Sequence, residues 1–203
     1  MAYKGLAEFY YAEVDTDDAT NGTKYKAAPV ELQYPIESKY SEERAEGQLY
    51  AGDALREEES EFAKGTLSIG VSHDDDETFA KLLGNTVTSI SVGSGDGAET
   101  VKKISVGGSD TPIKVGFAQI VPIIINGAKK YKVEFFYMVK FAPGDKERST
   151  KNGSIEYKTP SLEGTVFENA KGKHEEHATF ADIANARTFL TGLFPVTTPG
   201  VDD

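Results

Sequence analysis

Few residues of this chain have the type and spacing that metal binding requires. The segment from His174 to His177 reads His-Glu-Glu-His and comes closest to a metal motif. A His-Glu-x-x-His zinc site places two imidazoles four residues apart on one face of a helix, whereas here the spacing is three and no helix is predicted. On a strand, residues three apart point to opposite faces. We therefore interpret this segment as a solvated polar strand or turn.

Two other polar segments have simple structural interpretations. Asp74, Asp75 and Asp76 lack the alternating oxygen ligands and the final bidentate glutamate of a calcium loop. They are typical of a helix start, with Asp74 as the N-cap and Glu77 three residues later. Gly93-Ser-Gly-Asp-Gly97 precedes strand-forming residues, whereas a phosphate-binding loop needs a helix N-terminus behind it. We expect a hairpin turn there.

The residues that nucleophilic catalysis uses are also few. The chain has no cysteine and three histidines, and no serine stands in a Gly-x-Ser-x-Gly motif. Carboxylate pairs are too numerous to single out an acid and a base. We therefore predict that the protein is not an enzyme and has no catalytic residues, no metal site and no cofactor.

Charge and composition restrict the possible partners. The net charge of −11 argues against direct nucleic-acid binding through phosphates, which needs clustered lysine and arginine. The N-terminal residues lack the apolar core of a signal peptide, and no run approaches the roughly 20 apolar residues of a membrane span. We expect a soluble, single-domain protein over residues 1–203 that is made in a cytoplasm and has no membrane partner.

The strongest structural signal is the segment 113–141, in which two strand-like runs meet at Asn126-Gly127. The second run places six residues on one face: Tyr131, Val133, Phe135, Tyr137, Val139 and Phe141. A two-residue turn would pair odd with even positions and so mismatch the apolar faces of the two runs. An odd-length loop or a bulge near the turn would restore the match, and of these we expect a bulge close to Asn126-Gly127. The alternative is that both faces of the hairpin are covered.

The remaining elements are mostly strands joined by tight turns. We expect strands over residues 5–14, 24–33, 66–71, 86–92, 99–106, 155–167 and 173–178. One short helix follows Asp74, buries Phe79, Leu82 and Leu83, and stops at Gly84. A second helix opens at Thr179 with Asp182 as a capping box, and buries Ile183, Ala186 and Leu190. The predicted fold is mainly β, an antiparallel sandwich or barrel with one or two short flanking helices.

Residues 38–62 lack periodicity, and we predict a long loop there. Five acids fall among the nine residues from Asp53 to Glu61. The segment is either a disordered charged loop or an arm that becomes ordered against a neighbouring subunit. Residues 197–203 should form a loose C-terminal tail.

Several segments together resemble the major tail protein of long-tailed bacteriophages. They are Phe9-Tyr-Tyr-Ala-Glu13, Gly47-Gln-Leu-Tyr-Ala-Gly-Asp53, Gly65-Thr-Leu-Ser-Ile-Gly70, Leu82-Leu-Gly84 and Tyr157-Lys-Thr-Pro-Ser-Leu-Glu-Gly-Thr165. Their order and spacing carry the resemblance, which covers about residues 5–168. Gly52 stands where that family often has aspartate, and the C-terminal segment lacks the tryptophan expected there.

The resemblance implies a tail tube protein. In that family a β-sandwich with a flanking helix forms hexameric rings, which stack into a hollow tube in the virion. Strands from each subunit complete an inner barrel, a long loop reaches a neighbour, and DNA passes down the lumen without specific binding. The implied partners are other copies of the chain and other tail proteins, such as tape measure and tube-end proteins. Assembly would take place in the cytoplasm of the host bacterium.

We place the expected subunit interfaces on residues 113–141 and on the loop 38–62. The candidate interface residues are Leu49, Tyr50, Leu55, Phe117, Ile120, Phe136 and Met138. The alternative is a β-sandwich module that binds a carbohydrate or a cell surface. Such a module usually carries an exposed aromatic platform, often with tryptophan, and an export signal. This chain has no tryptophan and no recognisable signal.

Overall fold

The computed structural model describes residues 2–3, 5–32, 34–51, 54–72, 76–93, 97–144 and 159–197. Within these ranges the side chains of residues 2–3, 49–51 and 54–58 are not described. The predicted N-cap Asp74, the centre of the glycine-rich turn and the end of the C-terminal tail lie outside the described residues.

The described part is mainly β, with strands in antiparallel pairs. In chain order its elements are β1 (Ala2–Tyr3), β2 (Glu8–Asp18), β3 (Gly22–Tyr25), β4 (Val30–Leu32), β5 (Pro35–Ala51), β6 (Ala54–Val71), α1 (Asp76–Leu82), β7 (Thr86–Val92), β8 (Glu99–Ser105), β9 (Lys114–Ile125), β10 (Ala128–Pro143), β11 (Ser161–Phe167), β12 (Glu175–Phe180) and α2 (Ile183–Gly192). The large sheet has the order β3-β2-β9-β10-β11-β6-β5, and β7 and β8 form a separate pair. This confirms the predicted fold class.

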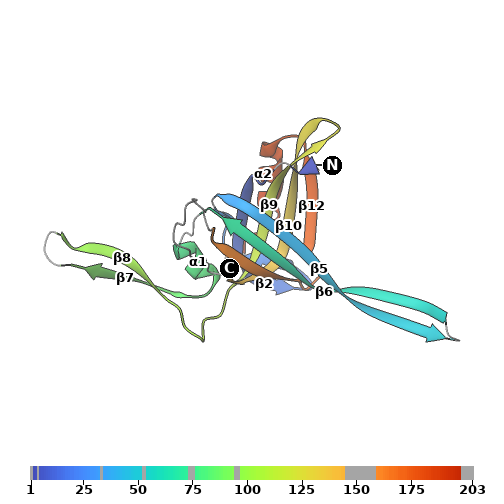
Figure 1. The fold of residues 1–203 in the computed structure, drawn as a ribbon, viewed down its shortest axis with the longest axis horizontal. Helices are drawn as coiled ribbons and strands as arrows, with labels where there is room; N and C mark the ends of the chain where they lie inside the picture. Colours follow the sequence, from blue (N-terminus) through green and yellow to red (C-terminus); the bar gives the residue numbers. More distant parts are fainter. Residues whose placement is uncertain are drawn as a thin grey trace, which may run out of the picture.

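Strand β10 is where the large sheet divides into two layers (Figure 1). Its first half pairs with β12, from Tyr131 to Phe136, and its second half pairs with β11, from Met138 to Pro143. One apolar core lies between β2, β9 and β10 on one side and β6 and β11 on the other, and α1 contributes Leu82 to it. A second core lies under α2, on the opposite face of β9 and β10.

The β9–β10 hairpin turns in two residues. Asn126 and Gly127 have φ of 51° and 78°, and Ile125 pairs with Ala128 across them. These positive φ values are those of a type I′ turn, whose twist matches the twist of the strands. The predicted bulge close to the turn is therefore wrong, because the register shift lies between Phe136 and Val139.

The shift changes which face of β10 each residue occupies. Before it, Val133 and Phe135 belong to the core under α2; after it, Val139 and Phe141 belong to the core beneath β6 and β11. The prediction that these odd-numbered residues share one face is wrong. The alternative, that both faces of the hairpin are covered, is correct.

Helix α1 confirms its predicted apolar stripe. Leu82 is buried, and Phe79 and Leu83 pack against the same core. The helix is followed by Gly84 with φ of 71°, and a Cβ there would lie 2.1 Å from the carbonyl oxygen of Thr111. Only glycine fits this position, because both the backbone angle and the close approach exclude a side chain.

Helix α2 begins later than predicted. Its N-cap is Asp182, whose Oδ1 accepts a hydrogen bond from the Ala184 N–H at 2.6 Å. Thr179 lies in β12 and pairs with Lys132, so the predicted capping box at Thr179 is wrong. The helix buries Ala186 and Leu190 as predicted, because these positions face the sheet one turn apart. Ile183, also predicted to be buried, is half-buried.

The arginine of α2 anchors the helix to β2. Arg187 Nε donates hydrogen bonds to Glu8 Oε1 and Oε2 at 3.1 and 3.0 Å, and Nη2 also bonds to Oε1. Tyr10 donates to the same carboxylate at 2.8 Å. Burial tends to raise the pKa of Glu8, but the hydrogen bonds from Arg187 and Tyr10 outweigh it and leave the pKa below its ordinary value.

The segment 38–62 is not a loop. It belongs to the β5–β6 hairpin, which is paired from Pro35 with Val71 out to Ala51 with Ala54. Ser38 and Tyr40 still face the body, but from Ser41 to Gln48 every residue of β5 is exposed. Apolar alternation requires a core on one face. The described residues of the outer hairpin face no core, which is why their sequence shows no period.

We predict that Gly116→Ala destabilises the fold by about 1–3 kcal/mol, the usual effect of overpacking a core. A Cβ at Gly116 would lie 2.5 Å from the ring of Tyr25, which is fully buried. Urea denaturation measures the free energy of unfolding. Gly47→Ala is the control, because a Cβ there meets no atom within 4 Å, and its effect should stay within about 0.5 kcal/mol. Equal effects of the two variants would contradict the packing described here.

We predict that Arg187→Gln lowers the melting temperature at pH 7 and that its deficit shrinks as the pH falls through the range below 4.5. The pKa of Glu8 is depressed from 4.5 in the folded protein, so the stability that its carboxylate contributes is present above that value and is lost on acidification. Melting curves between pH 3 and pH 7 test this. Arg44→Gln, on the exposed β5–β6 hairpin, is the control. If the loss of melting temperature in Arg187→Gln did not change with pH, the stabilising role of the Glu8–Arg187 pair would be contradicted.

Candidate assembly surfaces

Four of the seven predicted interface residues lie in the core of the subunit. Phe117 and Ile120 have no exposed surface, and Phe136 and Met138 are 1% and 5% exposed. Phe117 and Phe136 are paired across the β9–β10 ladder. These four residues are core residues of the subunit, and the prediction that they form a subunit interface is wrong. They are covered by other elements of the same subunit.

The other three predicted interface residues lie far out on the β5–β6 hairpin. Leu49 pairs with Glu57, and Tyr50 pairs with Leu55. The backbone thus places all three near the tip, and their side chains are outside the described residues. We call residues 42–51 and 54–64 of this hairpin the acidic arm.

The described side chains of the acidic arm are mostly charged and exposed. The acids are Glu42, Glu43, Glu46, Glu59 and Glu61, against the bases Arg44 and Lys64. Arg44 connects the two strands, because Nε and Nη2 donate to Ser60 Oγ and O at 2.9 and 3.1 Å. Lys64 Nζ lies 3.2 Å from Glu43 Oε2. Figure 1 shows the arm extending away from the body.

The root of the acidic arm is held by aromatic contacts. The rings of Phe62 and His174 are stacked, with centroids 3.9 Å apart and planes 7° from parallel. His174 Nε2 also lies 3.8 Å from Glu42 Oε2. Behind them the ring of Tyr40 packs on Phe136 with centroids 4.8 Å apart. Burial, with added repulsion from Glu42 and Glu175, raises the pKa of Tyr40 to about 12.

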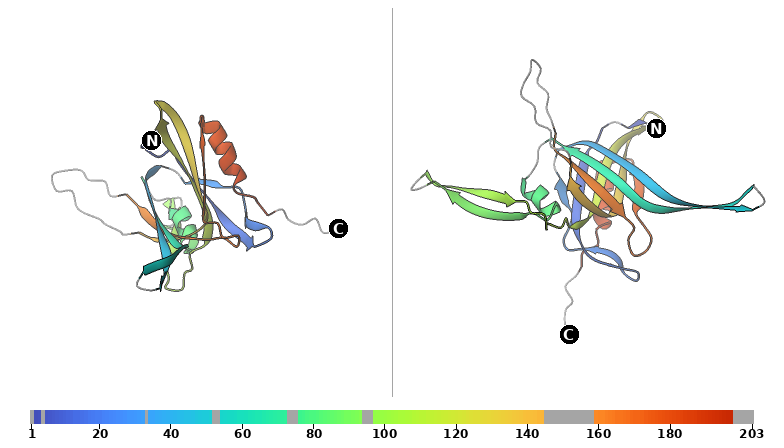
Figure 2. Two further views of the ribbon diagram at one scale, coloured as in Figure 1. Left: turned by 90° about the vertical axis from the view of Figure 1, so that its right-hand side faces the viewer. Right: turned by 60° about the horizontal axis from the view of Figure 1, so that its bottom comes forward.

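A second two-stranded element leaves the body on the other side (Figure 1; Figure 2, right). We call β7 and β8, residues 86–92 and 99–105, the ribbon. The hairpin predicted here is confirmed, with seven pairs from Thr86 with Ser105 to Val92 with Glu99. The half-buried Val87 and Ile104 pair near its base. Towards the tip, Ile90 and Val92 are 38% and 55% exposed.

Both elements have a strand edge that no other strand covers within the described ranges. The outer edge of β5 ends the large sheet, and β7 and β8 pair only with each other. A free edge presents a row of backbone N–H and C=O groups that another strand can pair with. Sequence reasoning missed these edges, because pairing partners far apart in the chain leave no local signal.

The histidine segment does not converge on a metal site. His174 stacks at the root of the arm, whereas His177 is largely exposed, with Nδ1 3.5 Å from Glu175 Oε1. Among the described residues no three histidine, aspartate or glutamate side chains are placed to hold a metal ion. Neither helix in the described ranges is long and apolar enough to cross a membrane.

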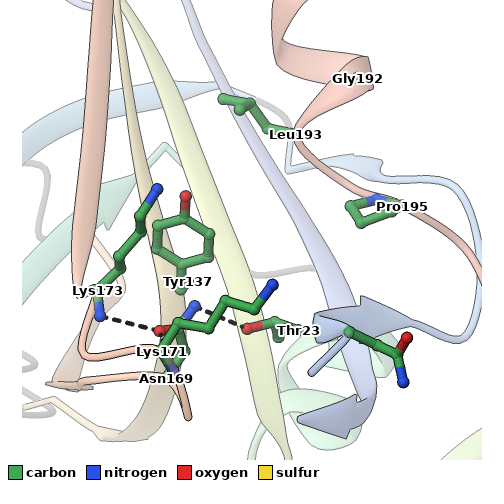
Figure 3. A pocket seen from close by; sticks show the side chains of 10 residues that line it. Thr23, Tyr137, Asn169, Lys171, Lys173, Gly192, Leu193 and Pro195 are labelled. Carbon is green, nitrogen blue, oxygen red and sulfur yellow. Dashed lines mark hydrogen bonds between the residues drawn. The ribbon is translucent and has the colours of Figure 1, made fainter. Parts of the chain in front are cut away.

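One cavity lies where the β2–β3 turn, the β11–β12 turn and the end of α2 meet (Figure 3). Its polar wall includes Asn169, whose Nδ2 donates to Thr23 Oγ1 at 3.2 Å and whose Oδ1 accepts from the Lys173 N–H at 2.9 Å. The charged residues that line it are Lys171 and Lys173. These hydrogen bonds fix the turn, and the lining offers no nucleophile paired with a base.

We predict that His174→Ala loosens the acidic arm at its root. An aromatic contact of this kind contributes about 0.5–1.5 kcal/mol, which corresponds to roughly two- to tenfold faster opening. Hydrogen–deuterium exchange over residues 42–62 should accelerate by that factor, while exchange in β9 and β10 stays unchanged. His177→Ala is the matched control, because its ring makes no stacking contact that fixes the arm. Equal exchange in the two variants would contradict the role of the stack.

Comparison with known proteins gives no family for this chain. No protein-family model matches it, and no curated protein matches it. The function is therefore argued from the arm, the ribbon and the free strand edges.

Proposed function

We propose that this protein is a non-enzymatic structural subunit that assembles into stacked rings, the tail tube of a long-tailed bacteriophage, whose lumen conducts DNA. The observation that carries the proposal is the acidic arm. It continues the β5–β6 hairpin beyond the body as two strands whose described residues are almost all exposed.

An arm of this kind needs a partner surface. A two-stranded hairpin is marginally stable in water, and three or more strands or a packed face are required for independent stability. The Phe62–His174 stack holds only its root. At about 3.3 Å per residue, the strand from Glu42 to Ala51 reaches roughly 30 Å, far enough to lie across an adjacent subunit.

The position of the resembling segments supports the same function. Gly47 to Ala51 lies in the outer arm, Gly65 to Gly70 lies in β6, and the described end of the last segment, Thr159 to Thr165, includes most of β11. Strands β5, β6 and β11 are neighbours in one sheet. Three of the five segments that resemble the tail protein family thus lie on neighbouring strands of the subunit, whereas the other two lie in β2 and at the end of α1.

The charge of the chain suits a tube through which DNA moves. Phosphates are repelled by a surface of net negative charge, so DNA could slide along such a lumen without binding to it. When identical subunits repeat the same contact around a rotation axis and the last subunit meets the first, they form a closed ring. In the proposed tube, further rings stack on the first. Other tail proteins would meet the tube at its ends and in its lumen.

The alternative of a carbohydrate- or surface-binding module gains no support. Among the described residues, the exposed large apolar side chains are Val30, Tyr34, Ile36, Ile90, Val92, Val106, Ile124 and Val196. Tyr34 is the one aromatic residue in this set, so the described surface carries no aromatic platform.

We predict that shortening the acidic arm yields a folded subunit that does not assemble. Replacing residues 47–59 by Asn-Gly closes the hairpin at the Glu46–Ser60 pair with a two-residue turn. The melting temperature should stay near that of the wild type, because the Phe62–His174 stack and both described cores are retained. Light scattering after gel filtration and negative-stain electron microscopy then compare assembly.

The control for this variant keeps the arm at full length and carries Gly47→Ala. The wild type and the control should form rings or tubes with a central hole, and the shortened variant should remain monomeric. Normal tubes from the shortened variant would refute the role of the arm. Wild-type protein that stays monomeric at high concentration would refute the tube function itself.

A further inference from the structure

We infer that the partner of the acidic arm is the ribbon of a second copy: the outer edge of β8 pairs with the outer edge of β5 in the next subunit. This inference rests on the proposed assembly and names the surface that it uses. Within the described ranges both edges lack a strand partner, and each could supply the backbone hydrogen bonds that the other lacks.

The charges along the two edges are complementary. Strand β8 carries Lys102 and Lys103, and strand β5 carries Glu42 and Glu43. Consecutive residues of a strand point to opposite faces, so each doublet places one charge on each face. Pairing the doublets brings opposite charges together on both faces, whether the strands run parallel or antiparallel. Pairing β5 with another β5 at these positions would instead place glutamates together, which is unfavourable.

The present partners of these side chains do not prevent the contact. Lys102 Nζ lies 3.3 Å from Glu77, and Lys64 lies 3.2 Å from Glu43, with about half or more of each side chain exposed. Glu42 accepts a hydrogen bond from Arg44 Nη1 of the same strand at 2.5 Å, and 29% of its side chain is exposed. Exposed ion pairs contribute little stability. They can be exchanged for partners on another copy without a large loss.

The ribbon gains stability from the proposed pairing. Alone it has two strands, and Ile90 and Val92 remain exposed on one face beside the half-buried Val101. Beside the arm it becomes part of a four-stranded sheet in the order β7-β8-β5-β6. A sheet of that width meets the strand number required for stability in water.

The geometry requires that the two edges come from different copies. The ribbon and the acidic arm leave opposite sides of the body in both views (Figure 1; Figure 2, right). A subunit therefore cannot pair its own ribbon with its own arm. The contact is head-to-tail, with different surfaces on the two partners, and such contacts build rings when the rotation closes.

A charge exchange tests the inference directly. Lys102→Glu with Lys103→Glu makes the ribbon acidic, and Glu42→Lys with Glu43→Lys makes that part of the arm basic. Each double variant alone should lose assembly, with association weakened by roughly tenfold or more. An equimolar mixture of the two should assemble again, because each acidic edge then meets a basic edge. Sedimentation velocity at low salt measures association, and electron microscopy shows the product.

The control reverses another lysine doublet. Lys129→Glu with Lys130→Glu, beside the β9–β10 turn, changes the net charge by the same amount and lies on neither edge. This variant should assemble like the wild type. A mixture of the two edge variants that fails to assemble, or edge variants that each still form normal rings, would overturn the inference and leave the tube function intact.

A covalent test identifies the partner strands. Because the chain has no cysteine, the single variants Glu43→Cys and Lys103→Cys can be mixed and joined by a short bis-maleimide. A heterodimer on a denaturing gel supports the β5–β8 contact. Cross-linking mainly between two Lys103→Cys chains would show a two-fold β8–β8 contact, in which Glu99 faces Lys103, and would overturn the inference. Wild-type protein that never associates would refute both this contact and the proposed function.

Discussion

The arrangement of this subunit depends on the bend of β10. The register shift between Phe136 and Val139 moves the side chains of the strand from one core to the other. A β-bulge of this kind increases the local twist and re-aims the side chains beyond it. As a result β10 can pair with β12 beside the core under α2, and with β11 beside the core beneath β6 and β11.

The bend also determines where the acidic arm leaves the body. Strand β11 pairs with β10 on one side and with β6 on the other. Its pairing with β6 extends only as far as Gly65, the partner of Val166. Beyond that residue β6 has β5 as its only partner among the described strands. At the point of departure Gly65 leaves room for Tyr40, since a Cβ there would lie 2.5 Å from the tyrosine ring. The direction of the arm is thus set by the core below it.

The elements that follow local rules could be predicted from the sequence. The Asn126-Gly127 turn and the stripe of Phe79, Leu82 and Leu83 depend on residues close in the chain. The position of the bulge in β10 could not be predicted, because apolar residues occur on both faces and the sequence does not say which core each one enters. Thr179 was mistaken for a helix cap because its role in β12 depends on a pairing with distant Lys132.

The candidate surfaces were harder to predict than the fold. Apolar residues such as Phe117 and Ile120 suggested an interface, but in this subunit they complete its own core. The acidic arm looked like a loop, because strands exposed on both faces need no alternation. The sequence predicts a solvated polar strand or turn at His174, whereas its ring is a packing surface for Phe62. Contacts between distant segments decide each of these roles.

The pairing of β6 with β11 has a consequence for the order of events during synthesis. The two strands are separated by residues 72–160, which include the whole β9–β10 hairpin. His174, which holds the root of the arm, is made later still. A nascent chain that has released only its first half therefore lacks the strand that supports β6, and contacts between such distant segments form late in folding. The root of the acidic arm therefore becomes ordered only when translation is nearly complete, and in the proposed assembly this order of events would place folding before polymerisation.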